Sequence, residues 1–265
     1  MTDETSQQKA ADSFEEAARL EQEFLNLADW YEAAIEEGIS VLLEAKRVLE
    51  KDSAHSHTMI RSLSSRLKTP KSIIGKMKRF NFPLTFESMQ ENLQDIAGIR
   101  IVCSYIYDIY ALRRWLLSQT DFELIVAKDY ISSPKPSGYR SLHLIFNVPV
   151  VRNNEKRMIP MEIQIRTTAM DSWASLEHQL RYKAGKISDK DIHKELRECA
   201  DLLYETDQRM QKIFLKLSFE GPSPEQEADF AEEGKDQKSG EHSEFDKMVQ
   251  LAIDEQYDPE NKPSS

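Results

Sequence analysis

The spacing of apolar residues changes several times along the middle of this chain, and this pattern limits the fold more than any other feature. Two-residue alternation and short apolar runs predict strands at 60–68, 98–103, 122–127, 142–148 and 158–166. Helical spacing predicts helices at 71–80, 106–119, 168–183 and 189–218. Pro70 suits the start of the first of these helices. The sequence therefore predicts an α+β domain with helical flanks.

The two ends of the chain differ from this middle part. Residues 14–52 have helical spacing and predict two helices joined near Gly38. Beyond Gly221 the composition turns to Pro, Glu, Asp, Ser and Lys, which predicts a mostly disordered tail with one helical segment at the apolar patch 245–253. The expected organisation is a helical arm at 1–54, one catalytic domain at 55–218 and an acidic tail at 219–265.

Several classes of protein are excluded by composition. No apolar run reaches the roughly 18–20 residues needed to cross a bilayer, and the N-terminus has neither the basic region nor the apolar core of a signal peptide. Two cysteines, Cys103 and Cys199, are too few for a disulfide scaffold or a cysteine zinc site. We therefore expect a cytoplasmic protein.

Charge is divided among the same three parts. The net charge of the chain is −11, but residues 1–52 carry −9, residues 219–265 carry −10 and the middle carries +8. Seven bases and no acid occur between residues 61 and 79. Acidic ends are typical of solvated faces or tails. The concentrated positive field of the middle part suits phosphate groups.

Phosphate binding in this chain must use side chains, because glycine is scarce. Only eight glycines occur, and none forms a GxxxxGK[ST] or GxGxxG pattern. Arg66 and Lys68 share one face of a predicted strand. Ser72, Lys76 and Arg79 share one face of the next helix, and N–H groups of its first turn favour an anion. A basic helix that only faces solvent explains this segment equally well.

Two carboxylates are candidates for binding a cation against phosphate oxygens. Asp95 precedes a tight turn into a strand and is expected at the edge of the sheet. Glu162 shares a strand face with Gln164 and Arg166, and such a polar face is costly unless it lines a cleft. Carboxylates on neighbouring strands can bind Mg²⁺. The alternative is that each is a surface acid paired with an arginine.

The segment 132–143 is a turn-rich loop with an aromatic ring among phosphate-binding groups. It carries Lys135, Tyr139, Arg140 and His143. Tyr139 can stack on a base, and the guanidinium of Arg140 can pair with phosphate. A plain surface loop is the alternative.

Four stretches in this order resemble the synthetase domain of the RelA/SpoT alarmone synthetases, and they are most similar to its small stand-alone members. The stretches are SRLKTPKSIIGKMKR at 65–79, QDIAGIRIVC at 94–103, DYISSPKPSGYRSLH at 129–143 and MEIQIRTTAMDSWASLEHQLRYK at 161–183. The resemblance implies a mixed β-sheet flanked by helices, similar to polymerase-beta-type nucleotidyltransferases.

The resemblance also implies an activity and a donor site. The activity is that of a GTP pyrophosphokinase, which transfers pyrophosphate from ATP to the 3′-hydroxyl of GTP or GDP and gives pppGpp or ppGpp and AMP. Asp95 and Glu162 would bind Mg²⁺, and Glu162 would activate the hydroxyl. Arg66 and Arg100 would sandwich the adenine. The implied contacts to the ATP phosphates are Lys68, Ser72, Lys76 and Arg79.

The implied acceptor site lies in the other two stretches. Tyr139 would stack on guanine, with His143 and Gln164 near the acceptor nucleotide. Lys135 and Arg140 would lie near its phosphates. Asp171 stands where some relatives carry Asn, and Lys128 where some carry Arg, so the sequence departs from the family pattern at these two positions.

The resemblance finally bears on regulation and assembly. The chain has no adjacent His-Asp pair of the hydrolase type, so we expect synthesis without hydrolysis. Small members are typically homotetramers, so the resemblance implies a homotetramer for this chain. We also expect regulation by RNA. Two alternatives stay open: a toxin-like relative that pyrophosphorylates the tRNA 3′ end, and a non-catalytic RNA-binding regulator. The second should lack Asp95 or Glu162, and both are present.

Overall fold

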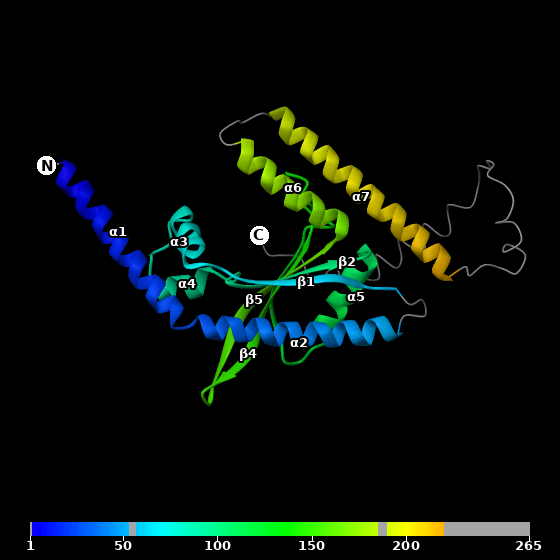
Figure 1. Cartoon of the computed structure of the whole chain (residues 1–265), viewed down its shortest axis with the longest axis horizontal. Coiled ribbons are helices and arrows are strands. Elements are labelled where there is room, and N and C mark those ends of the chain that lie inside the picture. Colours follow the sequence, from blue (N-terminus) through cyan, green and yellow to red (C-terminus); the bar gives the residue numbers. More distant parts are fainter. Residues whose placement is uncertain (1, 53–56, 185–189, 220–265) are drawn as a thin grey trace, which may run out of the picture.

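A five-stranded sheet is the centre of the computed structural model, which describes residues 2–52, 57–184 and 190–219 (Figure 1). The strand order is β1-β2-β5-β4-β3. Strands β2 and β5 run parallel and the other neighbours are antiparallel, so the sheet is mixed, as the family resemblance implies. The strands are β1 (Ile60–Leu67), β2 (Ala97–Cys103), β3 (Glu123–Asp129), β4 (Leu142–Arg152) and β5 (Glu155–Thr167).

Helices cover the sheet. Helix α2 packs along β4, β5 and β2, and α6 and α7 pack on each other across the sheet from it (Figure 1). Helix α5 lies between α2 and α7. Alpha-helices and sheet therefore form the predicted α+β fold. The helices are α1 (Thr2–Leu25), α2 (Ala28–Asp52), α3 (Pro70–Arg79), α4 (Phe86–Asn92), α5 (Ile106–Leu117), α6 (Thr168–Ala184) and α7 (Lys190–Phe219). Among these described helices, none is long and apolar enough to cross a membrane.

The register of the central strands places polar residues side by side. On β2 and β5, Gly98 pairs with Glu162 and Arg100 with Gln164. On β4, His143 pairs with Gln164. The alternating residues of β5, such as Ile163 and Ile165, are fully buried in the core. One face of the inner strands therefore builds the core and the other presents polar side chains.

Gly38 does not join two helices, so that prediction is wrong. The helices α1 and α2 meet at residues 26–27, and Gly38 lies inside α2. A Cβ at this position would come within 2.6 Å of Met161 Cε and 2.7 Å of Ile99 Cδ1. The glycine thus lets the helix approach the sheet closely.

Two further details differ from the sequence prediction. Asp95 is not at the edge of the sheet, because β2 lies between β1 and β5; it precedes the N-terminal end of an inner strand. Helix α4 was missed because its sequence, FESMQEN, is mostly polar. Thr85 caps it by accepting a hydrogen bond from Ser88 N, and Met89 is buried. The predicted helical segment at 245–253 lies outside the described residues, and the domain boundaries stay predictions.

Two glycines of the helices should respond to substitution in opposite ways. Gly38→Leu should lower the free energy of unfolding by roughly 1–3 kcal/mol, because it overpacks a filled core. Gly75 lies in α3, where an added Cβ would meet nothing within 4 Å. Gly75→Ala should therefore raise the free energy of unfolding by roughly 0.5–1 kcal/mol. Urea denaturation of both variants checks this, and equal effects would contradict the close packing of α2.

Candidate active site

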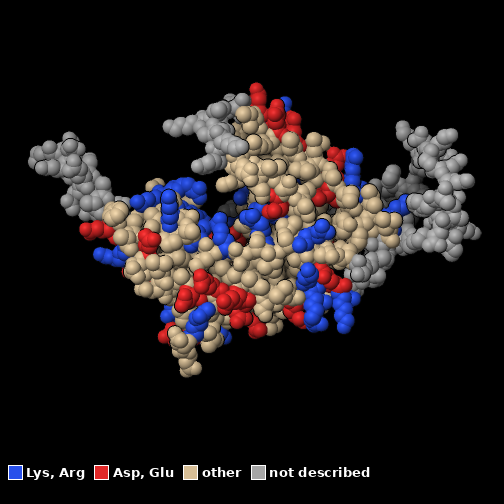
Figure 2. Space-filling model, viewed as in Figure 1, with Lys and Arg blue, Asp and Glu red and all other residues tan. Residues whose placement is uncertain are grey.

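A polar cavity of about 350 Å³ opens where β1, β2 and β5 lie side by side. Lys and Arg side chains gather over α3 and beside the hollow in the middle of this face (Figure 2). Two carboxylates line this cavity, Asp95 just before β2 and Glu162 on β5. It is also lined by two arginines, one on β1 and one on β2. Its lining residues are Ser64, Ser65, Arg66, Asp95, Gly98, Ile99, Arg100, Glu162 and Gln164. Residues from three of the predicted stretches therefore meet in one site.

Asp95 holds two lysines at one end of this cavity. Its Oδ2 accepts from Lys68 Nζ at 2.5 Å and from Lys76 Nζ at 3.0 Å. Burial favours a higher pKa for Asp95, but the two ammonium groups outweigh burial and hold the pKa below its ordinary value. The other oxygen, Oδ1, is buried and has no hydrogen-bond partner among the described residues. Asp95 is therefore ionised with one free acceptor atom.

The lysines reach Asp95 because of how α3 begins. Thr69 caps the helix by accepting a hydrogen bond from Ser72 N at 3.3 Å, and Pro70 occupies the first helical position. Lys76 then lies almost two turns into the helix and faces Asp95. Lys68, immediately before the cap, is 6% exposed, and burial lowers its pKa from the ordinary value.

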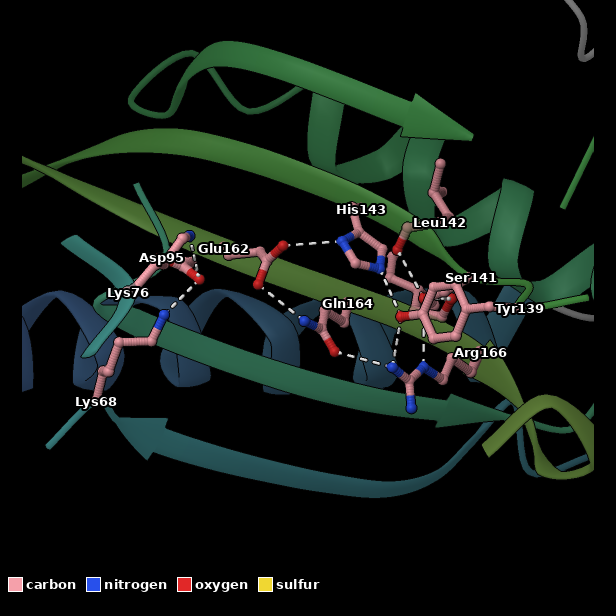
Figure 3. A network of polar contacts seen from close by, with 11 residues as sticks. Lys68, Lys76, Asp95, Tyr139, Ser141, Leu142, His143, Glu162, Gln164 and Arg166 are labelled. Atoms are coloured by element: carbon pink, nitrogen blue, oxygen red, sulfur yellow. Dashed lines mark hydrogen bonds and ion pairs between the residues drawn. The ribbon is translucent and has the colours of Figure 1, made fainter. Parts of the chain in front are cut away.

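Five side chains form a closed ring of hydrogen bonds beside the cavity (Figure 3). Arg166 Nη2 donates to Tyr139 Oη at 2.6 Å and to Gln164 Oε1 at 3.1 Å. Tyr139 Oη lies 2.8 Å from His143 Nε2, and His143 Nδ1 lies 2.8 Å from Glu162 Oε1. Gln164 Nε2 donates to Glu162 Oε2 at 2.8 Å, which closes the ring.

The direction of the bonds on the Gln164 side of this ring follows from Arg166, and a neutral His143 gives a matching direction on the other side. A guanidinium only donates, so Tyr139 Oη and Gln164 Oε1 accept from it. Tyr139 is then free to donate to His143 Nε2, and the proton of a neutral imidazole lies on Nδ1 and points at Glu162. The Tyr139–His143 branch and the Gln164 branch therefore each end in a group that donates a hydrogen bond to Glu162. Burial favours a higher pKa for Glu162, but these donors outweigh burial and hold the pKa below its ordinary value.

Arg166 is a candidate site residue to which the sequence assigned no role. Its side chain is 5% exposed, and Nη1 forms an ion pair with Asp171 Oδ1 at 3.1 Å. Arg100 lies 3.8 Å from the same oxygen. The available signal was its place on the polar face of β5, two residues after Gln164. The ion pair with Asp171 compensates the charge of this buried guanidinium.

The loop between β3 and β4 places a lysine and two tyrosine side chains next to His143 and the hydrogen-bonded ring. Lys135 Nζ lies 4.4 Å from the centre of the Tyr130 ring and 4.8 Å from that of Tyr139. Tyr130 also packs edge-on against His143. Burial lowers the pKa of Lys135 from its ordinary value. Tyr130 is a second residue that the sequence analysis did not assign.

The other predicted site residues lie in three places. Arg140 turns away from the cavity toward α7, where Nη2 meets Asp201 Oδ1 at 3.1 Å. Ser72 and Arg79 do not line the cavity: the Ser72 hydroxyl lies 2.9 Å from Thr69 Oγ1, and Arg79 lies over the Phe80 ring. Lys128 is exposed on β3, opposite His143 of β4. The nucleotide contacts predicted for Arg140, Ser72 and Arg79 stay predictions.

The carboxylates of this site fit a divalent cation shared with a ligand. Within the described ranges, no three His, Cys, Asp or Glu side chains are grouped as a metal site. Asp95 and Glu162 line one cavity, and Asp95 Oδ1 is buried without a partner. Mg²⁺ is commonly bound by one or two carboxylates together with substrate phosphates, so this donor set suits it.

Comparisons with known proteins agree with this geometry. Residues 65–187 match the model of a region found in RelA/SpoT proteins. The chain is 44% identical over 159 residues to the GTP pyrophosphokinase YwaC of Bacillus subtilis, which covers 60% of this chain and 76% of that protein. It is 36% identical over 184 residues to the GTP pyrophosphokinase YjbM of the same organism. This alignment covers 69% of this chain and 84% of YjbM.

Solved structures give the same result. The crystal structure of small alarmone synthetase 1 from Bacillus subtilis bound to its product pppGpp superimposes with a TM-score of 0.66 at 31% identity, and it covers 74% of this chain and 99% of that one. A GTP pyrophosphokinase family protein from Streptococcus pneumoniae gives a TM-score of 0.65 at 31% identity. The superposition covers 80% of this chain and 98% of the Streptococcus pneumoniae chain.

Fold, site and comparisons together define an α+β transferase that acts on nucleotides. The chain belongs to the RelA/SpoT family and, within it, to the small alarmone synthetases.

Proposed function

We propose that this chain transfers the β,γ-pyrophosphate of ATP to the 3′-hydroxyl of GTP or GDP. The products are AMP and pppGpp or ppGpp. The observation that supports this most strongly is the place of Glu162, which lines the cavity with Arg66, Arg100 and Asp95 and is also bonded to His143 of the ring that holds Tyr139. One carboxylate thus faces both a donor and an acceptor site.

The donor half would use the cavity and the start of α3. Arg66 and Arg100 lie on adjacent antiparallel strands, and planar guanidinium groups stack well on an adenine ring. Lys68 and Lys76 would neutralise the triphosphate. Ser72, in the first turn of α3, and Arg79, on the exposed side of that helix, would complete the phosphate contacts.

The acceptor half would use the ring of hydrogen bonds and the β3–β4 loop. Tyr139 would stack on guanine, while Lys135 would neutralise the acceptor phosphates. Glu162 Oε1 or Oε2 would accept the proton of the 3′-hydroxyl. The hydroxyl oxygen would then bond to the β-phosphorus of ATP, while the bond between that phosphorus and the oxygen that leaves with AMP breaks. Such transfer relies mainly on positioning and on neutralisation of charge. Asp171, held by Arg166, would orient the acceptor base.

Asp95 and Glu162 would hold Mg²⁺ in this reaction. The bound ion supplies charge neutralisation and polarises the phosphate oxygens. Chelation with EDTA should stop AMP formation, and addition of Mg²⁺ should restore it. Full activity of the metal-free protein would contradict this assignment.

The proposed activity is tested by incubation with ATP, Mg²⁺ and GTP, GDP or GMP, with the products separated by anion exchange. We expect AMP and a guanosine 3′-pyrophosphate in equal amounts. Addition of pppGpp alone should give no loss of pppGpp, as expected for synthesis without hydrolysis. Modification of the tRNA 3′ end without any guanosine product would favour the toxin-like alternative instead.

Tyr139→Ala should raise the KM for GTP by about ten- to 100-fold, since stacking of one base on an aromatic ring is worth about 1–3 kcal/mol. The KM for ATP should stay within twofold, because Tyr139 does not line the cavity. Tyr139→Phe is the matched variant: it keeps the ring and loses only the hydroxyl bonded to His143 and Arg166. Equal losses for ATP and GTP would contradict the acceptor role.

Assembly and location complete the proposal. We expect a homotetramer in the cytoplasm, and regulation by RNA stays a prediction. Helix α7 carries large apolar side chains that are more than half exposed, which supports self-association: Leu202, Met210, Ile213 and Leu217. Leu202→Glu combined with Ile213→Glu should lower the mass in light scattering. A wild-type protein that is already monomeric would contradict the expectation.

A further inference from the structure

The guanidinium of Arg140 makes three contacts inside the chain. Nη1 donates to the carbonyl of Ile131 at 2.9 Å, and Nη2 forms an ion pair with Asp201 Oδ1 at 3.1 Å. The face of the group lies 4.0 Å from the centre of the Tyr204 ring. Its side chain is 12% exposed, and Nε is buried without a hydrogen-bond partner among the described residues. These contacts point the guanidinium toward α7 and the base of the loop, away from the cavity.

A second contact joins the same loop to the same helix. Gly138 adopts a φ of +89°, and a Cβ there would lie 2.7 Å from Ala200 Cβ and 3.3 Å from Arg197 Cα. The loop backbone therefore touches α7 one residue before Tyr139, and Arg140 binds the helix one residue after it. The two contacts bracket Tyr139 on both sides.

Helix α7 is in turn fixed to the body of the domain. Trp173 Nε1 of α6 donates to the carbonyl of Leu196 at 2.8 Å. The hydroxyl of Thr167, at the end of β5, donates to Asp207. The base of the loop has its own support, because Asp129 accepts from Ile131 N and from Tyr110 Oη. The loop is therefore held at its base by α5 and near Tyr139 by α7.

We propose that Arg140 is a positioning residue, and that it fastens the acceptor loop (residues 130–141) to α7 so that Tyr139 is held ready for the guanine nucleotide. Asp201 and Tyr204 are its partners on the helix. This assignment rests on the proposed pyrophosphate transfer and replaces a direct contact between Arg140 and the acceptor phosphates. Helix α7 thereby becomes part of what sets the affinity for the acceptor.

Asp201→Ala separates the two roles, because they predict opposite signs. If Arg140 bound phosphate, Asp201 would compete for its guanidinium, and its removal would lower the KM for GTP. If the ion pair between Arg140 and Asp201 fastens the loop, its removal should raise the KM for GTP by about threefold. The effect is modest because Asp201 is half exposed. Arg140→Lys keeps the charge but cannot meet Ile131, Asp201 and Tyr204 together, so we expect a rise of about tenfold. The KM for ATP should stay within twofold in both.

Glu205→Ala is the matched control. Glu205 also lies on α7 and accepts from an arginine, Arg209, but both side chains are exposed and neither touches the loop. Its KM for GTP should equal that of the wild type. A KM for GTP that is unchanged or lower in Asp201→Ala would overturn the proposal.

Hydrogen exchange gives a readout that does not depend on the reaction. In the nucleotide-free protein, amides of residues 130–141 should exchange faster in Asp201→Ala and Arg140→Lys than in the wild type and in Glu205→Ala. Unchanged exchange would overturn the fastening role even if the enzyme is active. A wild type that forms no guanosine 3′-pyrophosphate would refute the proposed function, while faster loop exchange in the variants would still support the contact itself.

Discussion

Glu162→Gln should lower kcat by about 10³-fold or more, because this single substitution removes both a proton acceptor and a carboxylate that faces the cavity. The amide has the same size but cannot take up the proton of the 3′-hydroxyl. It also presents one oxygen where the carboxylate presents two, so it cannot accept from both His143 and Gln164. The free energy of unfolding should fall by only about 1 kcal/mol, the cost of one mismatched hydrogen bond. AMP formation and thermal denaturation measure the two effects.

Glu155→Gln is the matched control for this experiment. Glu155 lies at the start of the same strand, is exposed and pairs with Arg157. Its substitution should change neither kcat nor the melting temperature beyond error, as is usual for exposed ion pairs. A Glu162→Gln protein that keeps more than a tenth of the wild-type kcat would show that another group accepts the proton.

The strands and the face on which Glu162 lies could be predicted because those features are local. Alternation along 158–166 places Glu162 and Gln164 on one face and Ile163 and Ile165 on the other, whatever the rest of the chain does. Parallel pairing of β2 with β5 then brings the cavity residues together, and of this arrangement the family resemblance implied only a mixed sheet. The carboxylates were expected on neighbouring strands; Glu162 lies on β5, whereas Asp95 lies just before β2, the parallel neighbour of β5.

The ring of hydrogen bonds could not be predicted in the same way. It depends on the pairing of His143 with Gln164 across β4 and β5, which is set by the register of the hairpin and not by composition. Arg140 shows the same limit more strongly. Its residue type suits phosphate, but its direction is decided by Asp201, sixty-one positions later in the chain. Gly38 was interpreted as a break because the glycine alone does not reveal what it packs against.

Arg166→Met should separate activity from stability. Arg166 alone donates to both branches of the ring, so its loss frees the Tyr139 hydroxyl and allows the Gln164 amide to turn away from Glu162. We expect kcat/KM for GTP to fall by about 10²-fold, since misplacement of reacting groups by about 1 Å costs that much. Methionine fills a similar apolar volume and removes a buried charge, while it leaves polar partners without a donor. The free energy of unfolding should therefore fall by no more than about 1–3 kcal/mol.

Two further variants make this expectation decisive. Arg157→Met, on the same strand, removes an exposed guanidinium that lies over the Trp30 ring and pairs with Glu155, so it should leave kcat/KM for GTP unchanged. Arg166→Lys keeps the charge beside Asp171 but can donate to fewer partners from a single point, so its kcat/KM should lie between wild type and Arg166→Met. If Arg166→Met instead keeps kcat/KM for GTP within threefold while the protein remains folded, Tyr139 and Gln164 are held by their other neighbours, and the donors on Glu162 do not depend on the buried guanidinium.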